Sequence, residues 1–249
     1  MTVPRDDSVV LGHHEVPAVQ AVLASIDRDR LVARVLGIDD LEQVTPPPAI
    51  DAGDGLRRLH GSHHIEGYVR SPVRVVAGTA RGIHLVSPEG RAVRPTSDRV
   101  KEAMFNALVS MGVVEGATVL DLFAGSGALG IEALSRGAAH AMFVDRSRDA
   151  VTAIRTNLAR TGVAARSKVI RADASSVLAG WTRPPVDVAL LDPPYDHDEW
   201  DSLLGSIPAR VVVVESDRLV AIPDRFQLQR DRRYGSTVVR IAELRESTS

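Results

Sequence analysis

The sequence Thr118-Val-Leu-Asp-Leu-Phe-Ala-Gly-Ser-Gly-Ala-Leu-Gly130 joins an apolar run to a glycine-rich turn. The run 119–123 is typical of a buried parallel strand. Gly125, Ser126 and Gly127 form a turn that only small residues allow, and an apolar-periodic helix is predicted from Ala128. Strand, glycine turn and helix make up the first unit of a nucleotide-binding α/β sheet, where N–H groups at the helix N-terminus face the ligand. A purely structural turn would show the same pattern.

Two later features favour the ligand-binding interpretation. A short strand, residues 139–145, ends on Asp145, and a carboxylate about 20 residues after such glycines can accept hydrogen bonds from both hydroxyls of a ribose. A buried strand beginning at Asp187 ends in Asp192-Pro193-Pro194-Tyr195. This tetrapeptide has no use in a dehydrogenase, whereas an amino-group methyltransferase needs it.

The chemistry of methyl transfer to an exocyclic amine explains that need. Such an amine is a poor nucleophile because its lone pair is delocalised into the ring, so the lone pair must be held along the S–CH3 axis of a sulfonium. Asp192 can accept one N–H and the carbonyl of Pro193 the other, while both prolines fix φ so that the carbonyls point into the site. Tyr195 can stack on a base swung out of its stack. The rate gain would come mostly from proximity and orientation, with an electrostatic contribution.

Length and composition limit the function classes. A chain of 249 residues can hold one full α/β domain and something small. It contains no cysteine, which excludes disulfides, thiolate metal sites and a cysteine nucleophile. The first residues lack the features of a signal peptide, and no apolar run approaches the ~20 residues that span a bilayer. We therefore expect a cytoplasmic protein without a membrane partner.

The N-terminal part, residues 1–69, is predicted to be an extension of unknown role. Helical periodicity runs from Val16 to Val44, and Pro46-Pro47-Pro48 then breaks any helix before a linker rich in Gly, Asp and His. The histidines of this linker lack a carboxylate framework, so no metal site is predicted. The extension carries 11 acidic and 6 basic residues, whereas residues 70–249 carry 21 acidic and 24 basic ones. The mild basic balance of the second part suits a polyanionic partner.

Residues 70–92 are predicted to form a basic β-hairpin. The segment 73–86 alternates around Gly78 and Gly82 as a hairpin would. The basic residues from 70 to 101 are Arg70, Arg74, Arg81, Arg91, Arg94, Arg99 and Lys101. A solvated charged face is one explanation. Contact with RNA or DNA phosphates is the favoured one, with Arg74, Arg81, Arg94 and Arg99 as the candidate residues.

The remaining pattern completes an α/β fold. Residues 94–108 predict a helix capped by Thr96 or Ser97, with Val100, Met104, Phe105 and Leu108 as its buried stripe. Helices are predicted at 149–160, 174–179 and 199–204, and strands at 167–173, 210–215, 225–230 and 237–242. The last two strands would pair as an antiparallel hairpin. The result is an open, mainly parallel sheet with one reversed strand. Asp173 ends a strand and could accept a hydrogen bond from an adenine amino group.

Together these motifs resemble the class I S-adenosylmethionine-dependent methyltransferases, whose sheet is Rossmann-like. Within that class the chain is similar to the RsmD-type family, which methylates guanine N2 in bacterial small-subunit rRNA. The resemblance covers about residues 70–245. Its parts are residues 73–82, residues 94–99 with Phe105-Asn106, residues 121–127, residues 192–195 and Tyr234-Gly-Ser-Thr237. The hairpin and the Arg94 segment narrow the resemblance to this family, because the other motifs are shared by many methyltransferases.

The resemblance implies a role for each motif. Asp121, Gly125, Ser126 and Gly127 would cradle the methionine part of S-adenosylmethionine, Asp145 would hold the ribose, and Asp173 with Ala174 would frame the adenine. Asp192, Pro193, Pro194 and Tyr195 would orient the guanine amine. The expected partner is the small ribosomal subunit or its assembly intermediate, and the expected state is a monomer. Residues 1–69 have no counterpart in the usual family pattern.

Other functions stay open at this point. A methyltransferase acting on adenine N6 or on a protein glutamine amide could carry the same tetrapeptide. A DNA enzyme is disfavoured because the chain has no insertion large enough for a target-recognition domain. A non-catalytic RNA-binding assembly factor could also keep this fold, although the intact Asp192 and glycine turn speak against it.

Overall fold

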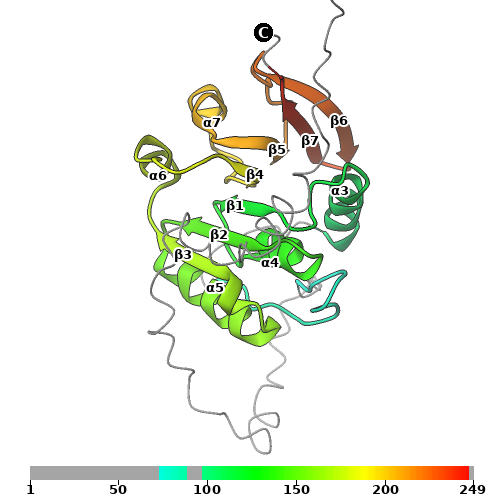
Figure 1. The fold of residues 1–249 in the computed structure, drawn as a ribbon, viewed down its shortest axis with the longest axis vertical. Coiled ribbons are helices and arrows are strands. Elements are labelled where there is room, and N and C mark those ends of the chain that lie inside the picture. The colour runs from blue at the N-terminus through cyan, green and yellow to red at the C-terminus, as the bar shows by residue number, and fades with distance from the viewer. Residues whose placement is uncertain (1–72, 89–96, 247–249) are drawn as a thin grey trace, which may run out of the picture. The chain divides into compact units, whose positions relative to one another are not determined.

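A computed structural model describes residues 73–88 and 97–246. A seven-stranded sheet has the order β3-β2-β1-β4-β5-β7-β6 (Figure 1). Its strands are β1 (Thr118–Leu122), β2 (His140–Asp145), β3 (Ser167–Arg171), β4 (Val186–Leu191), β5 (Ala209–Ser216), β6 (Phe226–Tyr234) and β7 (Thr237–Leu244). The helices are α3 (Asp98–Ser110), α4 (Ala128–Ser135), α5 (Arg148–Thr161), α6 (Ala174–Ala179) and α7 (Trp200–Ser206), with a 3-10 turn η3 (Ala164–Arg166). The predicted extension 1–69 and Arg94 lie outside the described residues.

The strand directions confirm the predicted fold class. Strands β1 to β5 run parallel, and β7 is antiparallel to both β5 and β6. The single reversed strand is therefore β7. Leu122 pairs with Val144 of β2 and with Leu191 of β4, so the residues that follow these three strands meet at one edge of the sheet. We call this edge, where β1, β2, β4 and β5 end, the carboxyl edge.

Helices cover both faces of the sheet, and alternate residues of the strands are buried beneath them. Val119, Phe143 and Leu190 point to one face and belong to the large core with α3, α4 and α5. Leu120 and Leu191, one residue out of phase, are equally buried, on the face covered by α6 and α7 (Figure 1). Full burial of one such side chain contributes about 1.5–3 kcal/mol. This double burial is why the parallel strands read as continuous apolar runs.

Local signals set the helix boundaries. Ser97 caps α3 by accepting a hydrogen bond from the backbone N–H of Val100 at 3.3 Å, and the predicted stripe of α3 is buried as expected. Gly130 lets α4 pack closely on the sheet, because a Cβ at this position would lie 2.4 Å from the ring of Phe143. Among the described helices, none has the length and apolar character needed to cross a membrane.

The segment 73–88 folds back on itself and docks on α4 and α5. Arg74 and His84 form an isolated antiparallel bridge, and the backbone N–H of Val75 donates to the carbonyl of Ile83 at 3.0 Å. Gly78 lies so near the end of α4 that a Cβ would come within 1.8 Å of the Ser135 carbonyl oxygen. Within residues 73–88 the predicted β-hairpin is thus reduced to one isolated bridge without a regular strand, and its turn is fixed against α4.

Candidate active site

The carboxyl edge brings the predicted motifs together. The glycine turn follows β1, Asp145 ends β2, and Asp192 directly follows β4. In the turn, Gly125 and Gly127 have φ of 58° and 76°, a region that favours glycine. Phe123, just before the turn, also has a positive φ of 60°. A bulky residue held in this region marks a locally constrained backbone.

Asp145 ties the glycine turn to the end of β2. Its Oδ2 accepts from the backbone N–H of Gly125 at 2.9 Å, and its Oδ1 accepts from that of Ser147 at 2.8 Å. The carboxylate is 3% exposed and lines a cavity. Each carboxylate oxygen has two lone pairs, so Asp145 can hold the turn and still accept from a diol in the cavity.

Asp121 supports the same turn from beneath. Its Oδ2 accepts from the backbone N–H of Gly130 at 2.9 Å, which satisfies a donor in the first turn of α4. The side chain is buried, and this burial raises its pKa well above the ordinary value. The Gly130 hydrogen bond opposes the shift, while the nearby carboxylates of Asp192 and Asp145 add to it. The pKa of Asp121 therefore depends on carboxylates in both predicted halves of the site, Asp145 in one and Asp192 in the other.

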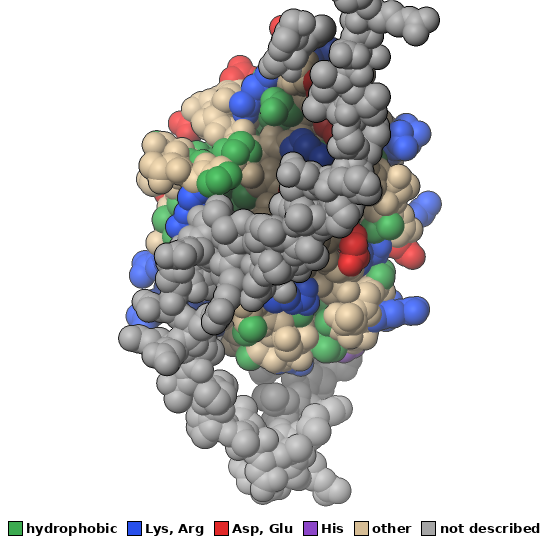
Figure 2. All heavy atoms as spheres, in the orientation of Figure 1, with side chains coloured by type: hydrophobic (Ala, Val, Ile, Leu, Met, Phe, Trp, Pro, Cys, Tyr) green, Lys and Arg blue, Asp and Glu red, His purple; other side chains and the backbone are tan. Residues whose placement is uncertain are grey.

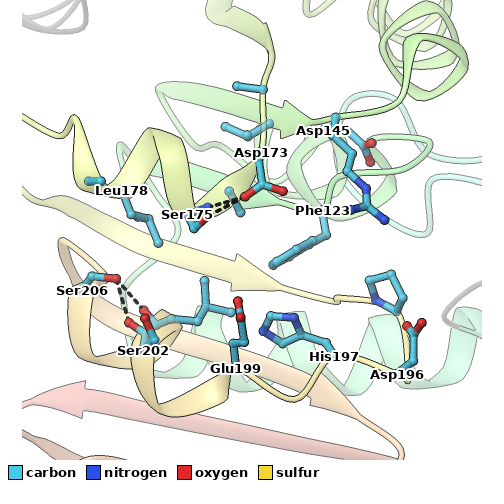
Figure 3. A pocket seen from close by; sticks show the side chains of 17 residues that line it. Phe123, Asp145, Asp173, Ser175, Leu178, Asp196, His197, Glu199, Ser202 and Ser206 are labelled. Atoms are coloured by element: carbon cyan, nitrogen blue, oxygen red, sulfur yellow. Dashed lines mark hydrogen bonds between the residues drawn. The ribbon is translucent and has the colours of Figure 1, made fainter.

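A cavity of 480 Å³ opens at the carboxyl edge, within the size range of small-molecule sites. Figure 3 shows Asp145 and Asp173 on one side of it, His197 with Glu199 and Ser202 on the other, and Phe123 between the two sides. Of the predicted cofactor residues, Asp145, Asp173 and Ala174 line it, whereas Asp121 and the glycine turn are not among its lining residues. Of the predicted catalytic residues, only Pro194 lines it.

Asp173 occupies the N-cap position of α6. Its Oδ1 accepts from the hydroxyl of Ser175 at 2.6 Å and from the backbone N–H of the same residue at 3.0 Å. The hydroxyl hydrogen bond is the main reason that the pKa of Asp173 is lowered. The carboxylate is therefore anionic at neutral pH and stands at the cavity wall, where it can accept from an amino group.

No sequence motif predicted the aromatic cluster beside the cavity. The ring centroids of Phe123 and His197 are 5.4 Å apart, and those of His197 and Trp200 are 5.2 Å apart. The Nε2 atom of His197 is buried and has no hydrogen-bond partner within the described part of the chain. His197 lines the cavity, but this atom is closed off from solvent, and leaving it unpaired costs about 1–3 kcal/mol.

Arg218, two residues past β5, is a second residue that sequence reasoning missed. Its Nη1 donates to the carbonyl of Tyr195 at 2.8 Å, and its Nη2 donates to the carbonyl of His197 at 2.6 Å and to Asp198 Oδ1 at 2.5 Å. One guanidinium therefore holds the loop that carries the end of the Asp192–Tyr195 tetrapeptide and one wall of the cavity.

The arginines predicted to contact RNA have different surroundings. Arg74 is half exposed and forms an ion pair with Asp98, with Nε and Oδ2 2.7 Å apart. Arg81 and Arg99 are exposed. Arg81 lies in the turn beside Ser135, the last residue of α4, whereas the glycine turn precedes the first residue of that helix. Arg81 thus lies about 12 Å, one length of α4, from the carboxyl edge.

Lys101, counted with the basic residues of the 70–101 stretch, does not lie on its charged surface. Its side chain is fully buried, its ammonium donates to the carbonyl of Arg74, and its Nζ lies 4.0 Å from Glu132 Oε2. Burial lowers the pKa of Lys101, with Glu132 opposing the shift. Glu132 also accepts from the backbone N–H groups of Val76 and Ala77 at 2.7 and 3.0 Å. Lys101 therefore belongs to a buried network that holds the 73–88 segment, and it is not accessible to a phosphate.

Comparison with known proteins identifies the family to which the chain belongs. A family model described as conserved hypothetical protein 95 matches residues 73–243. The ribosomal RNA small subunit methyltransferase D of Escherichia coli (strain K12) is 34% identical over 179 residues, which cover 68% of this chain and 88% of that protein. The chain belongs to the RsmD family. YlbH of Bacillus subtilis is 36% identical over 185 residues, covering 70% of this chain and 100% of its own length.

Solved structures share the RsmD-family fold. The yhhF protein of Escherichia coli has a TM-score of 0.62 at 32% identity, covering 71% of this chain and 100% of its own. TTHA0928 of Thermus thermophilus has a TM-score of 0.59 at 30% identity, covering 69% and 99%. SMU.776, whose structure was solved as a complex with SAH, shares the fold alone, at 13% identity and a TM-score of 0.50, covering 60% and 50%.

Proposed function

We propose that this RsmD-family protein transfers a methyl group from S-adenosylmethionine to the exocyclic N2 amine of a guanine in small-subunit rRNA. The observation that carries the proposal is the position of Asp192–Tyr195 at the carboxyl edge, beside the cavity that Pro194 and His197 help to line. The relatives named for small-subunit rRNA methylation support the substrate class. The small ribosomal subunit or an assembly intermediate is the proposed partner.

The residues around the cavity fit the cofactor. The Asp145 carboxylate suits a ribose diol, Asp173 suits an adenine amino group, and Phe123 with Leu178 provides apolar surface for a ring. S-adenosylmethionine supplies an electrophilic methyl group on a sulfonium. Asp121 and the glycine turn would border its methionine part, where a cation would stabilise the carboxylates of Asp121 and Asp192.

Asp192 and Pro193 would act on the acceptor. One N–H group of the amine would donate a hydrogen bond to the carboxylate oxygen of Asp192, and the other would donate to the carbonyl of Pro193. These two hydrogen bonds would turn the nitrogen lone pair toward the methyl group. Tyr195 is 42% exposed and can stack on a base that has left its helix. Asp192 also favours the positive charge that develops on the nitrogen, and the surplus proton then leaves to solvent or to that carboxylate.

Nucleoside analysis tests the proposal. Purified protein is incubated with labelled S-adenosylmethionine and either naked small-subunit rRNA or assembled small subunits from a strain that lacks the enzyme, and the digested RNA is examined by mass spectrometry. N2-methylguanosine at one position is the expected product, formed about 10²–10³-fold more slowly with Asp192→Ala. N6-methyladenosine would replace the guanine proposal with the adenine alternative. Tight cofactor binding without any transfer to RNA or ribosomal protein would point to an assembly factor instead.

A further inference from the structure

The turn between β6 and β7 reaches the carboxyl edge, although both strands belong to the far side of the sheet. Ser216, the last residue of β5, pairs with Val238, and Val238 pairs with Arg233. One residue back, Glu215 pairs with Val239, which pairs with Arg232. Because Leu191 pairs with Val214, these two arginines stand at the same level along the sheet as Asp192 and Pro193.

The spacing of the sheet gives the distance between the two places. Three strand-to-strand steps separate β4 from β6, and each step is about 4.8 Å. Arg232 and Arg233 therefore start about 14 Å from Asp192 along the carboxyl edge. One strand of a nucleic-acid helix advances about 3.4 Å per nucleotide. A strand whose target base sits at Asp192 would thus bring phosphates a few nucleotides away to this turn.

These arginines differ in their contacts from three other arginines of the chain. Arg74, Arg218 and Arg240 each form an ion pair with an aspartate. Arg232 and Arg233 are exposed, and within the described part of the chain no carboxylate lies within 4.0 Å of either guanidinium. Cross-strand partners show that they point to opposite faces of β6: Arg232 shares its face with Val239 of the large core, and Arg233 shares the other with Val238.

Tyr234 fixes the position of the turn. It packs against the large core, so the two arginines project from an anchored backbone. Figure 2 shows Lys and Arg side chains at several separate points of the visible face, so overall charge does not by itself mark one RNA-binding patch. Their register at the carboxyl edge, together with their exposure, distinguishes Arg232 and Arg233 from exposed arginines elsewhere, such as Arg81 and Arg155.

We propose that Arg232 and Arg233 form an RNA-contact surface that binds phosphates flanking the target nucleotide. The inference rests on the proposed function and adds to it the place where the substrate strand leaves the site. A competing explanation is that charges on the edge strand β6 only prevent edge-to-edge aggregation. The experiment must separate these two roles.

The test compares charge-changing pairs at two places. Arg232→Gln/Arg233→Gln removes two charges from the turn. Arg155→Gln/Arg160→Gln removes two exposed charges from the second half of α5, which runs away from the carboxyl edge, and serves as the matched control. Methyl transfer to rRNA is measured against RNA concentration at several salt concentrations, and cofactor affinity by calorimetry.

We expect the first pair to raise KM for RNA roughly tenfold and to reduce the salt slope by about 1.4, since each single-strand phosphate contact contributes about 0.7. Cofactor affinity and kcat at saturating RNA should stay at the wild-type value, and the α5 pair should behave as wild type. The proposal would be overturned if KM for RNA rose equally in the Arg232/Arg233 and Arg155/Arg160 variants, or if it stayed unchanged in the Arg232/Arg233 variant.

A third variant isolates the edge-protection explanation. Arg232→Glu/Arg233→Glu keeps the strand edge charged but repels phosphate. We expect a monodisperse protein, as judged by light scattering, with a KM for RNA higher than that of the Gln pair. A Glu pair that binds RNA like wild type, combined with aggregation of the Gln pair, would show that edge protection is the whole role. If wild-type protein transfers no methyl group to rRNA, the proposed function fails, whereas active wild type with unaffected variants rejects only this inference.

Discussion

The two halves of the candidate site are held in different ways. In the first half, the glycine turn, Asp121 and Asp145 are joined by hydrogen bonds between neighbouring elements β1, α4 and β2. In the second half, the Asp192–Tyr195 tetrapeptide continues into an exposed loop that one guanidinium, Arg218, holds from beyond β5. The proposed cofactor half is therefore built into the sheet, while the proposed target half is also tied by Arg218 across the carboxyl edge.

The largest expected effect tests whether methyl transfer can be lost from the proposed target half while cofactor binding in the other half is kept. Asp192→Ala should lower single-turnover methyl transfer by about 10²–10³-fold, the typical loss of one positioned group that stabilises charge in the transition state. Cofactor affinity and thermal stability should stay near wild type because the role proposed for Asp192 is to act on the acceptor amine. Asp192→Asn is the matched control, and should keep partial activity if the oxygen acts only as an acceptor. Transfer by the Ala variant at the wild-type rate would contradict the role.

Asp145→Ala is the counterpart in the cofactor half. It removes both a proposed ribose contact and the acceptor for the N–H of Gly125. Calorimetry should show S-adenosylmethionine binding weakened by about 1.5–3 kcal/mol, the usual contribution of a hydrogen bond to a charged group. Wild-type affinity in this variant would remove Asp145 from the site.

Arg218→Ala tests the contact that holds the target half. The loop loses three hydrogen bonds, so kcat for methyl transfer should fall about tenfold or more, which corresponds to about 1.4 kcal/mol of lost positioning. Millimolar guanidinium should restore part of the activity by occupying the same place, and Arg218→Lys should show an intermediate rate. A role in folding alone would give a lower melting temperature without rescue by guanidinium.

Asp121 should make the free energy of unfolding depend on pH. Its folded-state pKa is raised by burial, so its contribution to stability is fully present below the unfolded pKa and is lost as pH rises through the folded pKa. Without cofactor, wild-type stability should fall from pH 4 upward relative to Asp121→Asn, by at most about 1.4 kcal/mol per pH unit. Denaturant titrations from pH 4 to 8 measure this, and parallel curves for the two proteins would contradict it.

The smallest effect concerns the predicted hairpin arginines. Arg74→Ala/Arg81→Ala should reduce the salt slope of RNA binding by about 0.7 for each residue that touches a phosphate. Arg74 already pairs with Asp98, and surface pairs of this kind contribute about 0–1 kcal/mol to stability. Fluorescence anisotropy against salt measures the slope. An unchanged slope would restrict RNA contact to the carboxyl edge.

Sequence reasoning located the elements of this fold because their signals are local. The glycine turn, the Ser97 cap and the buried apolar runs each depend on neighbouring residues. Strand β1 and helix α6 lie within a residue of their predicted bounds, and α4 begins at the predicted Ala128. The positions of Asp145 and Asp192 at one edge also follow from strand order. What could not be predicted depends on contacts between distant residues.

Lys101 and Arg218 show this limit. In the sequence, Lys101 is one more positive charge among arginines. Only the fold shows that its ammonium is buried and forms an ion pair with Glu132 in the core. Arg218 follows β5 without a motif, and its target carbonyls are 23 and 21 positions earlier. The positive φ of Phe123 was equally hidden, because a bulky residue normally avoids that region.

The docking of the 73–88 segment has a consequence for how this chain is made. Asn157 donates to the carbonyl of Val86 at 2.9 Å and to that of Ser126 at 2.8 Å, and Glu132 holds Val76 from 56 positions later. The segment is synthesised before either partner, since translation proceeds from the N-terminus at about 5–20 residues per second. The segment can therefore dock only after α4 and then α5 have emerged from the ribosome. A stretch that is translated early is thus among the later ones to reach its native position.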